Sequence, residues 1–146
     1  MKTLRYLALL GLITTAPAFA GTETPECSPR MLAGRWMFAT DVGKQSFFPG
    51  GDITAIGTFW IDRFGVVSRG VFDATVADWG FLPGIKFTGS FALNADCTGT
   101  FTFTTSAGTT RTDSVIVLGP GHIRGMSQDV QFLWTYDMRR LLRSAT

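Results

Sequence analysis

The most constraining feature of this chain is an alternation of apolar and polar residues that runs from Leu32 to Leu142. Successive side chains of a β-strand point to opposite faces, so an apolar residue at every second position predicts strands with one buried face. Residues 85–94 show this best, with Phe87 and Phe91 in one phase and Lys86 in the other. No segment keeps a helical period over several turns. We therefore expect an all-β domain.

Eight segments combine this alternation with β-forming residues: 32–40, 53–62, 66–77, 85–94, 98–105, 109–118, 122–127 and 132–142. Most are separated by short connections rich in turn-forming residues, such as Gly119-Pro120-Gly121. Short connections suit strands that are antiparallel neighbours. We expect an eight-stranded antiparallel up-and-down barrel, with a two-sheet sandwich as the alternative.

The connections of such a barrel alternate between its two ends, so loop lengths can be sorted by end. One end receives the long connections at residues 41–52 and 78–84, together with the turns at 106–108 and 128–131. The other end receives tight turns alone. Because long loops more often carry function, we expect the open mouth of the barrel at the long-loop end.

The N-terminus has the pattern of a secretory signal peptide. Lys2 and Arg5 precede an apolar run at residues 7–13, and Ala18 and Ala20 form an A-x-A cleavage point. We predict a signal peptide at residues 1–20, a single barrel domain at 21–146 and a periplasmic or secreted location. No later stretch nears the roughly 20 apolar residues of a spanning helix, so we expect no integral membrane segment in the mature protein.

Charge argues against a polyanionic partner. The chain has 13 basic and 11 acidic residues, and two of the basic residues lie in the predicted leader, which leaves 11 of each. A mature chain of near-zero net charge lacks the main electrostatic attraction to nucleic acid or to an anionic membrane. We expect no nucleic-acid partner.

Cys27 and Cys97 are the two cysteines of the chain. In an exported protein they predict one disulfide, because the compartment is oxidising. Loop parity agrees, since it places both at the tight-turn end. A zinc site is the weaker interpretation, because two thiols and His122 lack ligand spacing. We expect no metal and no cofactor.

The first expected strand opens with Gly34-Arg35-Trp36, which resembles the G-x-W motif of lipocalins and their calycin relatives. In those proteins the tryptophan closes the base of the barrel, and a basic residue of the last strand lies across it. The resemblance implies that Trp36 and Arg140 form a structural pair at the tight-turn end, with the guanidinium over the indole ring.

A second resemblance covers more of the chain. Residues 55–59, 94–100 and 114–117 are similar to a group of small exported bacterial proteins built on an Asp-Cys-Thr-Gly turn, which is Asp96-Cys97-Thr98-Gly99 here. This resemblance implies a fold and a compartment, and it implies no activity.

Nine large aromatic residues share the inward phase: Trp36, Phe38, Phe59, Phe87, Phe91, Phe101, Phe103, Trp134 and Tyr136. An eight-stranded barrel is just wide enough to be filled by side chains or to hold one small ligand. The rings therefore form either a filled core or the wall of a binding cavity. For the cavity, we expect Phe87, Phe91, Trp134 and Tyr136 to line its upper part.

Five large apolar residues fall in the long loops: Phe47, Phe48, Trp79, Phe81 and Leu82. Such groups are costly to leave in water unless they cover something. We expect Phe47, Phe48, Trp79 and Phe81 to contact ligand at the entrance. The alternatives are a docking patch for a partner subunit, and hence a homo-oligomer, or a lid folded over the barrel end.

The sequence has few residues in arrangements typical of catalytic sites, and we assign no catalytic residue. The sequence has no nucleophile elbow, metal-ligand spacing or phosphate-binding loop. Arg69 and Asp73 share one phase of a strand, and an inward orientation would let them orient a ligand or assist acid–base chemistry. The outward orientation is the alternative.

We expect an exported barrel that binds a small apolar or amphipathic molecule. The alternatives are a cyclase or isomerase that holds an apolar substrate in shape, and a structural or partner-binding module with a filled core. An internal cavity would separate the first two from the third, and an ionisable pair facing that cavity would favour the enzyme.

Overall fold

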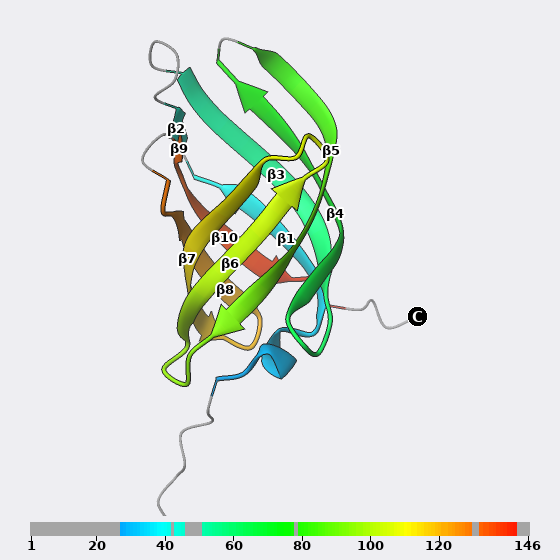
Figure 1. The fold of residues 1–146 in the computed structure, drawn as a ribbon, viewed down its shortest axis with the longest axis vertical. Helices are drawn as coiled ribbons and strands as arrows, with labels where there is room; N and C mark the ends of the chain where they lie inside the picture. Colours follow the sequence, from blue (N-terminus) through cyan, green and yellow to red (C-terminus); the bar gives the residue numbers. More distant parts are fainter. Residues whose placement is uncertain (1–26, 42, 46–50, 78, 130–131, 143–146) are drawn as a thin grey trace, which may run out of the picture.

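The chain forms a closed β-barrel in the computed structural model, which describes residues 27–41, 43–45, 51–77, 79–129 and 132–142 (Figure 1). A 3₁₀ turn, η1 (Pro29–Leu32), precedes the strands β1 (Gly34–Thr40), β2 (Gly43–Gln45), β3 (Gly51–Ile61), β4 (Val66–Val76), β5 (Gly80–Leu93), β6 (Thr98–Thr105), β7 (Thr110–Gly119), β8 (His122–Ser127), β9 (Phe132–Leu133) and β10 (Thr135–Arg140). The predicted leader lies outside the described residues. Within the described ranges, no helix has the length and hydrophobicity needed to cross a membrane.

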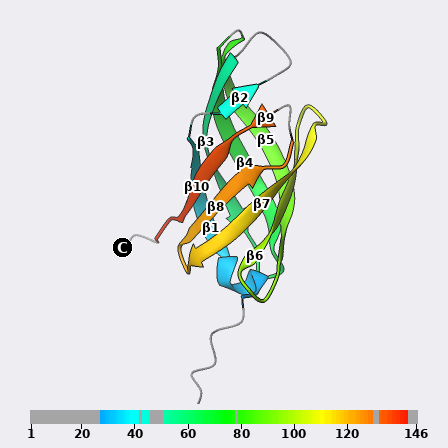
Figure 2. The ribbon, with the colours of Figure 1, turned by 90° about the vertical axis from the view of Figure 1, so that its left-hand side faces the viewer.

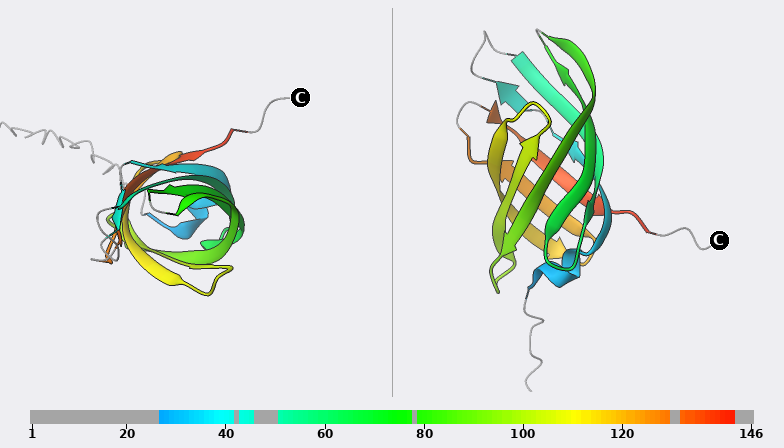
Figure 3. Two further views of the ribbon diagram at one scale, coloured as in Figure 1. Left: turned by 90° about the horizontal axis from the view of Figure 1, so that it is seen from above. Right: turned by 45° about the vertical axis from the view of Figure 1, so that its right-hand side comes forward.

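These ten segments make up eight strands of a closed barrel. β1 and β2 follow one another along β3, and β9 and β10 follow one another on the opposite side of β1 and β2. Because β1 pairs with both β3 and β10, the sheet closes into a ring, which Figure 3 shows from above. All pairings are antiparallel. The eight strands pair in chain order, and the first strand, β1 with β2, pairs with the last, β10 with β9. The predicted up-and-down barrel is confirmed, and the alternative sandwich is wrong.

The loop expected at residues 78–84 is wrong, because β4 and β5 continue there as a hairpin with its turn at Trp79. Pro83-Gly84 has the composition of a turn, but in the structure both residues lie opposite Asp73 of β4 and form a β-bulge. A bulge leaves its extra residue outside the ladder, so it tolerates a proline. Gly84 has a φ of +66°, and its N–H donates to Asp73 Oδ1 at 2.7 Å.

The tight-turn end of the barrel is closed by η1 and by a disulfide between Cys27 and Cys97, whose Cα atoms lie 5.0 Å apart. Figure 2 shows η1 beneath the strands at this end. Leu32 of η1 is fully buried, and its carbonyl oxygen accepts a hydrogen bond of 2.7 Å from Trp36 Nε1. This end of the barrel is therefore plugged by the chain that leads into β1.

The Asp-Cys-Thr-Gly segment forms the turn between β5 and β6. Asp96 Oδ1 accepts hydrogen bonds from the backbone N–H of Thr98 at 3.0 Å and from its hydroxyl at 2.6 Å. The bonds from Thr98 favour the ionised carboxylate and hold the pKa of Asp96 below its usual value. The carboxylate thus fixes the turn that carries Cys97 toward Cys27.

Inward side chains fill the part of the barrel nearest η1, which we call the lower half. Its buried residues are Leu32, Trp36, Phe59, Ile61, Val67, Phe91, Val117 and Ile123. The rings of Phe59 and Phe91 stack with a centroid separation of 6.5 Å. Outward neighbours on β5, such as Lys86 and Thr88, are exposed. The alternation seen in the sequence therefore separates core from surface as predicted.

Candidate functional site

A cavity opens in the upper half of the barrel, between the packed lower half and the end that carries β2 and β9. Twelve residues line it: Phe38, Thr40, Ile53, Ala55, Phe72, Phe87, Phe101, Phe103, Asp113, Trp134, Tyr136 and Met138. The space open to the centre of a water molecule is about 40 Å³, and all empty space between the lining atoms, with the open mouth included, is about 460 Å³. The smaller volume describes what fits without movement, and it suits a few water molecules or one small group.

Aromatic rings form most of the cavity wall. The ring of Phe38 lies 6.1 Å from those of Phe72 and Phe87 and 6.4 Å from that of Tyr136, measured between centroids. Gly125 of β8 makes room for Tyr136, since a Cβ at this glycine would collide with the phenol ring. The result is an apolar site in which several aromatic faces and edges meet.

Asp113 of β7 is the one charged residue among the twelve that line the cavity. It is only 1% exposed, and its neighbours across the sheet are Phe101 on β6 and Ser127 on β8. Trp134 Nε1 donates a hydrogen bond of 3.2 Å to Asp113 Oδ2. A carboxyl group is thus set into an otherwise apolar wall and held there by an indole.

Asp113 Oδ1 and Tyr136 Oη are both buried, and neither makes a hydrogen bond of good geometry within the described part of the chain. The two side chains still influence one another. Burial raises the pKa of the Asp113 carboxyl, against the lowering effect of contacts with Trp134 and Tyr136. Burial, followed by the charge of Asp113, raises the pKa of Tyr136 well above its usual value. The two groups thus act on one another without a well-formed hydrogen bond, an arrangement that is uncommon for buried polar atoms in native proteins.

Arg111 and Asp129 stand beside this pair. Arg111 Nη1 lies 2.7 Å from Asp129 Oδ2, and the guanidinium carbon lies 5.6 Å from the centre of the Trp134 ring. The charge of Arg111 lowers the pKa of Asp113, whereas that of Asp129 raises it. Around Asp113, the described side chains therefore supply one cation, Arg111, for two carboxylates, Asp113 itself and Asp129.

Asp113 is the residue that the sequence interpretation missed, although its signal was present. It belongs to the strand expected at residues 109–118 and shares the phase of Val115 and Val117. A charged residue in the buried phase of a strand is uncommon, because an isolated charge is expensive to bury. The sequence interpretation considered the aromatic residues of the inward phase and did not include Asp113.

Three of the four residues expected in the upper interior do line the cavity, namely Phe87, Trp134 and Tyr136. Phe91 does not. It lies in the lower half, where its N–H donates a hydrogen bond of 2.9 Å to the carbonyl oxygen of Gly65 in the turn between β3 and β4. Alternation gives the face on which a residue lies, but the height of that residue also depends on strand tilt and stagger.

Trp79 and Phe81 lie at the end of the hairpin of β4 and β5, and neither lines the cavity. Their side chains are 56% and 63% exposed. Phe81 pairs with the exposed Thr75 and shares its outward face. Phe47 and Phe48 lie outside the described residues. Ligand contact at the entrance therefore stays a prediction for all four residues.

Trp36 and Arg140 meet at the closed end, as the calycin resemblance implies. They are paired across β1 and β10, and the guanidinium carbon of Arg140 lies 5.2 Å from the centre of the Trp36 ring. Arg140 Nη2 also donates to the carbonyl oxygen of Met31 in η1. The last strand is thus joined to both the first strand and the plug.

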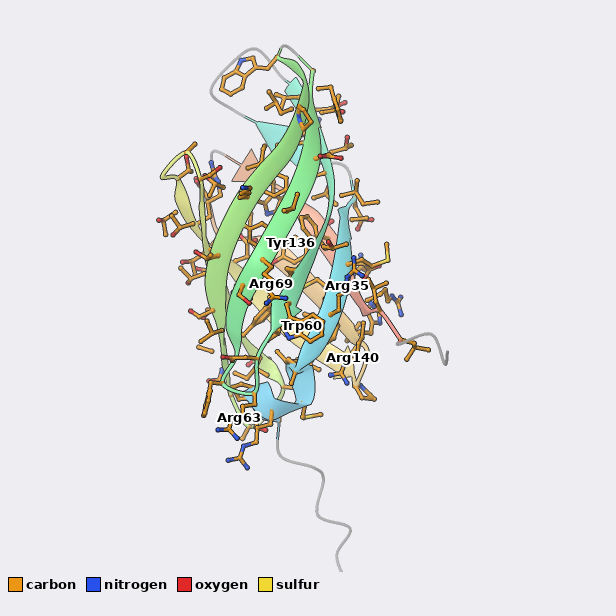
Figure 4. The ribbon with its side chains drawn as sticks, turned by 90° about the vertical axis from the view of Figure 1, so that its right-hand side faces the viewer. Arg35, Trp60, Arg63, Arg69, Tyr136 and Arg140 are labelled. Atoms are coloured by element: carbon orange, nitrogen blue, oxygen red, sulfur yellow. A yellow bond between two sulfur atoms is a disulfide. The ribbon has the colours of Figure 1, made fainter. Side chains whose placement is uncertain are left out.

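Arg69 is exposed, and Asp73 pairs with the outward-facing Ile56, so both lie on the outside of β4 and the inward orientation of this pair is excluded. Figure 4 shows Arg69 on the outer surface near Trp60, with Tyr136 on the inner side of the strands. His122 also lies away from the cavity, near the closed end, and its Nε2 is 2.7 Å from Asp137 Oδ1. In the described part of the chain, no group of three His, Cys, Asp or Glu residues could hold a metal ion.

No protein-family model and no curated protein matches this chain. Two solved structures of designed barrels resemble its fold. One is a de novo designed fluorescence-activating β-barrel, with a TM-score of 0.52 and 17% identity over 75% of this chain and 93% of the designed chain. The other is a redesigned β-barrel, mFAP1, bound to DFHBI, with a TM-score of 0.52 and 16% identity over 77% of this chain and 97% of that chain. At these identities the likeness shows the barrel fold alone.

Proposed function

We propose that this protein binds a small apolar or amphipathic molecule inside the upper half of the barrel. The observation that carries the proposal is the contrast between a packed lower half and an upper half in which twelve residues surround open space. Empty space forfeits packing contacts and therefore costs stability. The retained space therefore supports a binding role over a purely structural one.

The designed barrels support the proposal at the level of architecture. mFAP1 is a barrel of similar topology that is bound to DFHBI. What we transfer to this chain is the use of such a barrel as a container. The chemistry of the ligand is argued from the residues of this chain.

The proposal extends to the compartment and to the lineage. A structural disulfide such as that between Cys27 and Cys97 persists in oxidising compartments, which supports export of residues 21–146 to the periplasm or the medium. The contact between Trp36 and Arg140 supports kinship with the calycins. The hydrogen-bonded turn at Asp96 supports kinship with the small exported proteins that share its motif.

We propose that the ligand enters from the end that carries β2, β9 and the hairpin of β4 and β5. Trp79 and Phe81 are large, exposed and apolar at this end, and Phe47 and Phe48 belong to the connection predicted beside them. Replacing Trp79 by Ala should weaken ligand binding more than replacing Phe64, which is 64% exposed in the turn between β3 and β4 at the other end. Equal effects of the two variants would reject this entrance.

Binding can be tested by titration with N-phenyl-1-naphthylamine, an apolar dye that fluoresces when it leaves water, and by native mass spectrometry for a co-purified ligand. Ala55→Leu should weaken dye binding by about tenfold or more, because the larger side chain occupies the cavity. Ala92→Leu is the matched control, since Ala92 is exposed on β5. A wild-type protein that binds no apolar probe and retains no ligand would overturn the proposal.

A cyclase or isomerase is the second candidate function, and the buried pair of Asp113 and Tyr136 is the observation that favours it. A carboxyl group with a raised pKa can exchange protons closer to neutral pH than an ordinary one. Turnover separates the two functions. If the co-purified molecule is chemically changed by wild-type protein, and Asp113→Asn binds it without changing it, the protein is an enzyme.

A further inference from the structure

We infer that the ligand of this cavity carries a protonated amine on a small apolar body, and that Asp113 is the residue that recognises it. The inference rests on the proposed binding function and names the ligand class of the same site. Three features of the upper half support it: the position of Asp113, the aromatic wall and the size of the cavity.

The described side chains around Asp113 supply one cation for two carboxylates. The carboxyl is almost completely shielded from solvent, and its Oδ1 lacks a well-formed hydrogen bond among the described residues. A carboxylate at this depth requires a compensating partner, or it becomes protonated. Arg111 is shared with Asp129 at 2.7 Å, so one guanidinium faces two carboxylates. An ammonium group would complete the balance, whereas an anionic ligand would worsen it.

The aromatic wall adds a second attraction for a cation. Phe38, Phe103 and Trp134 line the same cavity as Asp113. The face of an aromatic ring carries partial negative charge and attracts an ammonium group, most strongly when water is excluded. The guanidinium of Arg111, 5.6 Å from the centre of the Trp134 ring, already uses this attraction. A carboxylate set among aromatic rings therefore discriminates between an amine and a neutral molecule of the same shape.

The size of the cavity limits the ligand to one ring or a short chain. The space of about 40 Å³ is smaller than the roughly 150 Å³ of a cavity that holds benzene, so a ring can enter only if a wall side chain moves. Trp134 is suited to this movement, because it is partly buried and lies between β9 and β10, outside any strand. The ammonium would take over the hydrogen bond that Trp134 Nε1 makes to Asp113 Oδ2. Tyr136 Oη can accept a second ammonium proton.

Four probes that share one ring test the inference: benzylamine, benzyl alcohol, toluene and benzoate, titrated by calorimetry or by ligand-observed NMR. At neutral pH benzylamine should bind at least about tenfold more tightly than benzyl alcohol or toluene, the scale of a charge-assisted hydrogen bond. Benzoate should bind most weakly. The preference for benzylamine should disappear as pH falls through the raised pKa of Asp113. Arg111, Asp129 and Tyr136 also face Asp113, so Asp129→Asn should be titrated in parallel.

Asp113→Asn should lose the preference for benzylamine and keep its affinity for toluene and for the apolar dye. The matched control is Asp52→Asn, which makes the same chemical change at an exposed position of β3 and should behave as wild type. If the Asn variant fails to fold, the pH dependence of the wild-type protein decides.

Two outcomes separate this inference from the function on which it rests. If toluene and the dye bind but benzylamine has no advantage, or if Asp113→Asn keeps that advantage, the amine inference is overturned and the binding function stands. If neither the dye nor any of the four probes binds wild-type protein, the binding function fails and the amine inference fails with it.

Discussion

The lower and upper halves of the barrel are built from the same strands but differ in what the strands enclose. Below, Trp36, Ile61 and Ile123 are each 0% exposed, and the inward rings stack on one another. Above, the strands surround a cavity with a buried carboxyl in its wall. The backbone is continuous between the two regions, so the difference comes from the side chains at each level. One small sheet therefore encloses a packed core at one level and open space at another.

The largest expected effect comes from truncating one ring in each half. Phe59→Ala should lower the free energy of unfolding by about 3–5 kcal/mol, because Phe59 is 2% exposed and stacks on Phe91 and Phe101. Phe72→Ala removes a partly buried ring that already borders open space, so it should cost clearly less. Urea denaturation followed by circular dichroism measures both. Equal losses would show that the two halves contribute alike to stability.

Reduction of the disulfide should have the next largest effect. The bond joins cysteines 70 residues apart, and its loss should lower stability by about 2–4 kcal/mol. Because the bond lies at the closed end, protein that remains folded after reduction should still bind the apolar dye. Thermal unfolding with and without reductant, and the double variant Cys27→Ser and Cys97→Ser, measure the effect. Alkylation of either cysteine before reduction would contradict the bond.

Asp113→Asn tests the energetic cost of the upper half through its pH dependence. Burial raises the pKa of Asp113 in the folded state, so folding favours the protonated carboxyl. That contribution is complete below the pKa of the unfolded chain, and it is lost as pH rises through the folded pKa. Above this window, wild type should be less stable than Asp113→Asn by about 1–3 kcal/mol, the cost of an uncompensated buried polar group.

Urea denaturation of both proteins between about pH 4 and pH 8 covers the expected window. Asp52→Asn provides the baseline, because Asp52 is exposed. A stability difference between wild type and Asp113→Asn that is the same at every pH would mean that Asp113 titrates alike in the folded and unfolded states.

The smallest effect concerns the contact between Trp36 and Arg140 at the base. A double-mutant cycle with Trp36→Phe and Arg140→Gln should give a coupling energy of about 0.5–2 kcal/mol, the range for a partly desolvated cation over a ring. The affinity for the dye should not change, because neither residue lines the cavity. Additive effects would show that the calycin comparison is misleading at this end.

The sequence predicted which side chains point into the barrel, but it did not predict how far along the barrel axis each of them lies. The alternation around Phe87 determined which residues point inward, since the period of a strand is a local property. The height of Phe91 depends on the pairing of β5 with β4 and β6, which involves residues far apart in the chain. For the same reason, the sequence predicted that nine aromatic rings point inward, but it could not predict which of them pack together and which border a cavity.

The errors that remained have separate physical causes. Pro83-Gly84 has the composition of a turn, and a bulge uses the same residues because it too needs a missing donor and a positive φ. Asp113 was overlooked because its neighbours in phase, Val115 and Val117, made the segment look like an ordinary core strand. Its partners, Trp134 and Tyr136, lie more than twenty residues away and are brought close only by closure of the barrel.

Above Lys86, whose carbonyl oxygen accepts a hydrogen bond from the N–H of Ser106, β5 has a free edge, because no described strand pairs with it higher up on that side. A free edge displays unpaired N–H and C=O groups, which can recruit a strand of another molecule and start aggregation. Pro83 and Gly84 lie in the middle of this edge. The proline has no N–H to offer, and the bulge bends the strand away from a flat template. The end of the barrel that carries the cavity is thereby protected against edge-to-edge polymerisation of the protein itself.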